Sequence, residues 1–130
     1  MKTLDTRAAE ILRALLALRT NKIDNSNGAY KPVHIALIGR RGKYNLISIT
    51  QYGELKGKRM RDPEMQFALD TATQQFIPYY YCNDYIDIET YSAIPTAEGL
   101  THCNEERLAD YAHFANRWLR NIAEQQNIPC

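Results

Sequence analysis

The C-terminal part of the sequence carries one long apolar stripe, and this stripe constrains the fold more than any other feature. Between residues 104 and 126, apolar side chains recur every three or four positions and fall within a stripe somewhat wider than about 100°, as on one face of a helix. Asn104 suits the N-cap, and Glu105 and Glu106 complement the helix dipole in the first turn. We therefore expect a helix over about residues 104–126 that buries Trp118. The stripe consists of Leu108, Tyr111, Ala112, Ala115, Trp118, Leu119 and Ile122.

A second amphipathic helix is predicted near the other end of the chain, over about residues 4–20. Its cap is expected at Thr3 or Asp5, and a polar loop around Gly28 follows it. The expected core face consists of Ala8, Ile11, Leu12, Leu15 and Leu18.

The chain between the two helices alternates in the manner of β-strands. Residues 33–39 are apolar on both sides, which favours an inner strand, and a hairpin turn is expected around Gly42. Residues 53–61 have two glycines and little periodicity, so we expect a basic loop there. Asp62-Pro63 is expected to start the third strand, with a short helix as the alternative. The strands are predicted at about residues 33–39, 44–52, 64–70, 76–82 and 85–93, and a loop at 95–103.

This order of elements defines the expected architecture. With 130 residues, the chain is of a size for one domain. A helix, four or five strands and a closing helix predict an α+β fold, in which the N-terminal and C-terminal helices pack on one face of an antiparallel sheet. The pattern does not define the strand order.

Composition excludes several classes of protein. Sixteen Lys and Arg against fifteen Asp and Glu give a net charge of +1, unlike a dedicated non-specific nucleic-acid binder, and 45% hydrophobic residues argue against disorder. No apolar run reaches the roughly 18 residues that span a bilayer, and the N-terminus lacks the apolar block of a signal peptide. We therefore expect a soluble, cytoplasmic protein without membrane contact. The three cysteines, at positions 82, 103 and 130, are odd in number and irregularly spaced, which favours reduced thiols over a disulfide framework.

Charge is unevenly distributed along the sequence. Residues 40–61 contain seven basic residues and one acid, whereas residues 62–106 contain nine acids and no Lys or Arg. The basic turns have two possible roles. They bind a phosphate group or an acidic partner, or they are solvated loops without a binding role. Weak nucleic-acid binding through them, with Tyr44 and Tyr52 as stacking groups, is a further alternative. The basic residues concerned are Arg40, Arg41, Lys43, Lys58 and Arg59.

The sequence contains no motif that assigns catalysis. The carboxylates of Asp62, Glu64 and Asp84 form an alternative acidic site, on which a small metal-dependent hydrolase or nucleotide-handling enzyme would depend. His102, Cys103 and His113 lack the fourth ligand and pair spacing of a zinc site, so we predict no metal ligands, no cofactor and no catalytic residues.

Tyrosine is the most distinctive residue type, with nine in the chain. Along a strand, Tyr79 and Tyr81 face one side and Tyr80 the other. Tyrosine at this density is typical of recognition surfaces, although packing on both faces explains it equally well.

Two segments resemble a family of small uncharacterised bacterial proteins encoded on plasmids, conjugative elements and phages. They are residues 61–67 (Arg-Asp-Pro-Glu-Met-Gln-Phe) and residues 78–87 (Pro-Tyr-Tyr-Tyr-Cys-Asn-Asp-Tyr-Ile-Asp). The resemblance covers about residues 33–92, and members often have glycine at the position of Asp87. It implies an accessory protein of a mobile element with no assigned reaction, which acts by binding, for example by inhibiting a host defence complex.

These features lead to a hypothesis of a non-enzymatic protein-interaction protein whose partner is another protein. The sequence does not indicate an oligomeric state. The expected interaction residues are Tyr79, Tyr80, Tyr81, Asn83, Asp84, Tyr85, Asp87, Arg40, Arg41, Lys43, Lys58 and Arg59.

Overall fold

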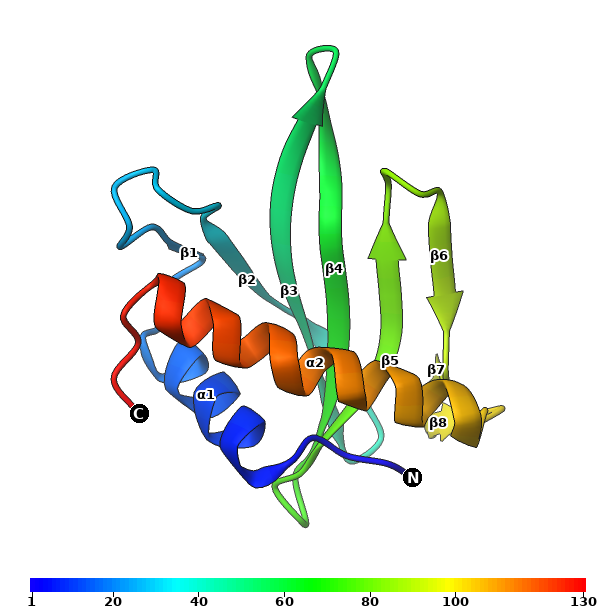
Figure 1. Ribbon diagram of the computed structural model, residues 1–130. Helices are drawn as coiled ribbons and strands as arrows, with labels where there is room; N and C mark the ends of the chain where they lie inside the picture. The colour runs from blue at the N-terminus through cyan, green and yellow to red at the C-terminus, as the bar shows by residue number, and fades with distance from the viewer.

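The computed structural model describes all 130 residues, as two helices and eight strands (Figure 1). Helix α1 spans Thr6–Ala17 and α2 spans Glu105–Gln125. The strands are β1 (Lys22–Ile23), β2 (Val33–Arg41), β3 (Tyr44–Leu55), β4 (Lys58–Asp70), β5 (Phe76–Asn83), β6 (Ile88–Tyr91), β7 (Ile94–Thr96) and β8 (Gly99–Thr101).

Strands β1 to β6 form one antiparallel sheet in the order of the sequence, and β7 and β8 form a separate hairpin. The α+β class and the antiparallel sheet are confirmed, but the sheet has six strands rather than four or five. Strand β1 was not predicted because its two residues are too few to show a period. The β7–β8 hairpin lies in the predicted loop at residues 95–103, and its strands of three residues are equally short.

Both helices cover the same face of the sheet, as Figure 1 shows. Asp5 caps α1, because its Oδ1 accepts a hydrogen bond of 2.8 Å from the backbone N–H of Ala8, and Asn104 caps α2 in the same way. Trp118 is buried, as predicted, whereas Leu18 lies beyond the last turn of α1 and is exposed. The core on this side joins Ile11, Leu12, Leu15, Trp118, Leu119 and Ile122 of the helices to Ile47, Ile49, Met65 and Phe67 of the sheet.

The basic segment at residues 53–61 is a strand hairpin, not the predicted loop. Strand β3 continues to Leu55 and β4 begins at Lys58, so that a two-residue turn joins them. Lys56 and Gly57 have φ angles of 52° and 78°, as a tight hairpin turn with a matching twist requires. In Figure 1 this hairpin projects well past the helices.

Pro63 lies inside β4 instead of at its start, and the alternative of a short helix is wrong as well. The register between β3 and β4 shifts between Thr50 and Tyr52, because β4 has one extra residue there. A proline has no N–H to give to the ladder, so a bulge is one of the few places where a sheet accepts it.

The second face of the sheet is covered only near the β2–β3 turn. There, the β7–β8 hairpin folds over a smaller apolar cluster that includes Tyr44, Leu46 and Tyr79. The contact is close, since a Cβ added to Gly42 would lie 2.4 Å from the carbonyl oxygen of Glu98. The remainder of this face, which we call the open face, carries polar side chains.

Candidate functional site

Two rows of side chains cross the open face, because the antiparallel register aligns residues of successive strands. One row is His34, Thr50, Glu64, Cys82 and Glu89. The other is Ala36, Ser48, Gln66, Tyr80 and Tyr91.

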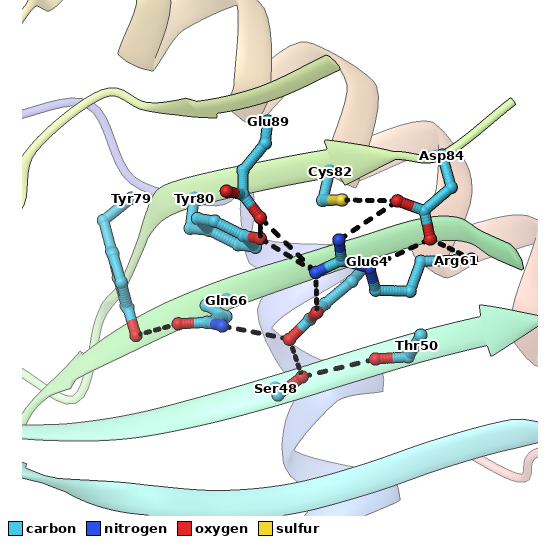
Figure 2. A network of polar contacts seen from close by, with 10 residues as sticks. All are labelled: Ser48, Thr50, Arg61, Glu64, Gln66, Tyr79, Tyr80, Cys82, Asp84 and Glu89. Atoms are coloured by element: carbon cyan, nitrogen blue, oxygen red, sulfur yellow. Dashed lines mark hydrogen bonds and ion pairs between the residues drawn. The ribbon is translucent and has the colours of Figure 1, made fainter. Parts of the chain in front are cut away.

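Arg61 of β4 is the centre of a polar network on this face (Figure 2). Its Nε and Nη2 donate to the two carboxylate oxygens of Asp84, each at 3.0 Å, and its backbone N–H donates to the same side chain at 2.7 Å. Its Nη1 lies 3.5 Å from Glu64 and 3.4 Å from Glu89. This guanidinium lowers the pKa of Asp84 to about 2, and the Asp84 carboxylate raises the pKa of Arg61.

Hydrogen bonds extend the network across β3, β4 and β5. Glu64 accepts from Ser48 Oγ at 2.7 Å and from the Gln66 side-chain amide at 2.9 Å. Gln66 in turn accepts from the Tyr79 hydroxyl at 2.7 Å, and the Tyr80 hydroxyl donates to Glu89 at 2.6 Å. No buried side-chain nitrogen or oxygen is left without a partner. The network is thus internally satisfied, and burial raises the pKa of both tyrosines.

The three carboxylates of the alternative acidic site do not converge on an open space. Glu64 and Asp84 face the Arg61 guanidinium, whereas Asp62 pairs with Lys31 at 2.5 Å and accepts from Asn83 at 2.9 Å. No group of three or more His, Cys, Asp or Glu side chains has the arrangement of a metal site. The carboxylates therefore act here as partners of two cations that the protein itself supplies, Arg61 and Lys31.

All three cysteines are free, and only Cys82 is buried. Burial raises the pKa of the Cys82 thiol, which donates to Asp84 at 3.6 Å. Its reactivity is correspondingly low.

The consecutive tyrosines belong to the packing of the protein. Tyr79 and Tyr80 are buried, and Tyr81 lies half-buried under α2, against Tyr111 and Phe114. Of the predicted interaction residues between positions 79 and 87, a partner could contact only those in the β5–β6 turn. There, Tyr85 and Asp87 are exposed, while Asn83 and Asp84 are engaged within the protein.

The basic residues form two separate groups at opposite ends of β3. Arg40, Arg41 and Lys43 lie at the β2–β3 turn, whereas Lys58 and Arg59 lie at the β3–β4 turn. A strand of twelve residues separates these turns by about 40 Å, so they do not form one patch. Within the groups, Lys43 pairs with Asp70 at 3.1 Å, and the Arg59 guanidinium lies 3.4 Å from the centre of the Tyr52 ring.

The free edge of β2, defined as residues 36–41, was missed by the sequence analysis. Strand β1 pairs only with Val33 and His34, so the prediction of an inner strand is wrong beyond that point. Leu37 is 78% exposed and Ile38 is 45% exposed. The signal was present in the apolar residues on both sides of the strand, but nothing in the pattern showed that β1 would stop after two residues.

These features define a class, the α+β domains in which two helices cover one face of an antiparallel meander. More particularly, the chain belongs to the family described as "Domain of unknown function (DUF6908)", whose model matches residues 5–128. The expectation of an uncharacterised family is thus confirmed, and the match includes both helices rather than only residues 33–92. Comparisons with curated proteins and with solved structures yield no match. Neither helix combines the length and apolarity needed to cross a membrane.

Proposed function

We propose that this chain functions by binding another protein, and that a strand of that protein pairs with the free edge of β2. The observation that carries this proposal is the exposure of Leu37 and Ile38 on the part of β2 that extends beyond its pairing with β1. Exposed apolar edges promote uncontrolled pairing, and natural proteins generally cover or charge them. A partner strand would cover this one.

The backbone at this edge supports the proposal. Ile35 donates its N–H to the carbonyl oxygen of Asn21 at 3.0 Å, so it faces the β1 side of β2. Alternation along an antiparallel strand then directs the N–H and C=O of Leu37 to the same side, where β1 has ended. Strand addition uses such groups for affinity and the flanking side chains for specificity.

The setting implied by the sequence resemblance fits this activity. A small accessory protein of a mobile element that inhibits a host defence complex acts by occupying a surface. The origin and the target remain predictions, as do the enzymatic alternative at Asp62, Glu64 and Asp84 and weak nucleic-acid binding at the basic turns.

Affinity capture from a bacterial lysate tests the proposal when three chains are compared. Leu37→Lys places a charge on the free edge, whereas Leu55→Lys makes the same change at the exposed tip of the β3–β4 hairpin. We expect one protein to be retained by the wild type and by Leu55→Lys but lost by Leu37→Lys. In the complex, hydrogen exchange should slow at the amide of Leu37. A partner that Leu37→Lys retains fully would contradict pairing at this edge.

A further inference from the structure

Two hollows flank the free edge of β2, one on each face of the sheet. The hollow on the helix side, of about 740 Å³, is lined mainly by apolar side chains that include Leu16, Ile35 and Leu37. The hollow on the open face, of about 510 Å³, is lined by polar and aromatic groups that include His34 and Tyr52. Both are open to solvent along the edge.

This arrangement matches the side chains of an added strand. Successive side chains of a strand point to opposite faces of the sheet. A strand paired with the free edge would therefore direct every second side chain towards the apolar hollow and the others towards the open face. The partner strand should thus be apolar at alternate positions.

Charge around the edge is basic. Arg19 lines the apolar hollow, Lys22 lines the polar one, and Arg40 and Arg41 lie on the edge itself. The only carboxylate that lines either hollow is Glu64, which already accepts hydrogen bonds from Ser48 and Gln66. An incoming strand with acidic residues would complement this surface.

The same charges disfavour a second copy of the chain. A symmetric antiparallel pair over residues 36–41 would place Arg41 of one copy opposite Ala36 of the other, close to the end of β2 where Lys22 pairs with His34. Cations of the two copies would then face each other at both ends of the pair. The bulge between Leu37 and Gly39 further hinders a regular symmetric ladder.

We propose that the free edge of β2 recognises an extended acidic segment of a partner protein, with apolar residues at alternate positions. This rests on the proposed function and specifies the chemistry of the partner. Arg40 and Arg41 would contact the acidic side chains, and Leu37 would pack against the apolar ones.

Selection from a displayed library of random ten-residue peptides tests the proposal. We expect enriched peptides to alternate apolar residues with Asp or Glu, and a synthetic copy of one to shift the amide NMR resonances of residues 36–41. Arg40→Gln with Arg41→Gln should weaken its binding at least tenfold. Lys56→Gln with Lys58→Gln makes the same change in net charge at the β3–β4 turn, away from both hollows, and should leave binding unchanged.

The alternative outcomes separate the two proposals. Enriched peptides that shift residues 36–41 but contain no excess of acid would overturn the acidic partner and leave strand pairing standing. Peptides that bind elsewhere, or no enrichment at all, would overturn both. A concentration-dependent dimer in sedimentation that Leu37→Lys abolishes would assign the edge to a second copy. Tighter binding of a duplex DNA oligonucleotide at the same residues would assign it to nucleic acid.

Discussion

Replacing Arg61 by methionine should destabilise the fold through the carboxylates that it leaves behind. The substitution removes the guanidinium from Asp84, Glu64 and Glu89 while keeping most of the apolar stem. The two bonds of 3.0 Å to Asp84 are charge-assisted, and each such bond contributes about 1.5–3 kcal/mol when buried. The Arg61 side chain is 34% exposed, so water screens part of this attraction. We expect a loss of about 2–3 kcal/mol in the free energy of unfolding.

Urea denaturation at pH 7 measures this loss. With a slope of about 2 kcal/mol per molar urea, the midpoint should fall by about 1–1.5 M. Arg117→Met is the matched control, because Arg117 is exposed on α2 and has no ion-pair partner. Its effect should stay within about 0.5 kcal/mol.

The pH dependence identifies the cause of the destabilisation. The pKa of Asp84 lies at about 2 in the fold, below its ordinary value of 3.8, so the stabilisation is complete above pH 4 and is lost as the pH falls through 2. The difference in stability between the wild type and Arg61→Met should therefore shrink as the pH falls from 4 to 2. A difference that stays constant over this range would refute the electrostatic explanation and leave a packing defect in its place.

Three further predictions test other parts of the fold. Trp118→Phe removes the indole N–H that donates to the Gln51 side chain at 2.8 Å and leaves this buried acceptor without a partner. The free energy of unfolding, measured by thermal or urea denaturation, should fall by about 1–3 kcal/mol, compared with about 3–5 kcal/mol for Trp118→Ala. Gly42→Ala should lower the melting temperature clearly more than Gly57→Ala: both have positive φ, but only the first would place a Cβ against the β7–β8 turn. Burial and two nearby cations lower the pKa of His34, so the unfolded chain binds the proton more readily. Stability should thus decline as the pH falls below about 6.5, and His34→Gln should flatten that dependence in urea titrations between pH 8 and pH 5.

The sequence predicts the helices and the middle of each longer strand well, because these segments have a clear period. Each helix cap depends on a single residue: Asn104 was predicted directly, and Asp5 was one of two candidates. What the period does not reveal is where a strand continues through a charged segment. The ends of β3 and β4 near Lys56 are exposed on both sides, so they show no alternation and look like a loop.

The polar network illustrates a second limit of the sequence. Arg61 belongs to a basic run, and Asp84 and Glu64 to an acidic one, so the pattern separates the groups that the fold unites. Their contact depends on the register of β4 against both neighbours and on the bulge beside Pro63. A shift of one residue would move Glu64 to the helix side. Pairing of this kind can be recognised only once the register is known.

The β2 strand combines both limits. Its apolar residues on both faces predict a strand that has a neighbour on each edge. Within the chain this prediction holds for Val33 and His34, which pair with β1. Ala36, Leu37 and Ile38 keep this apolar character although the neighbour has ended. These three residues are exposed in the isolated chain, and a bound partner strand would give them the neighbour that the prediction of an inner strand assumes. The exposure of these residues thus supports the proposed pairing, since apolar side chains at a free edge are those suited to the inside of a larger sheet.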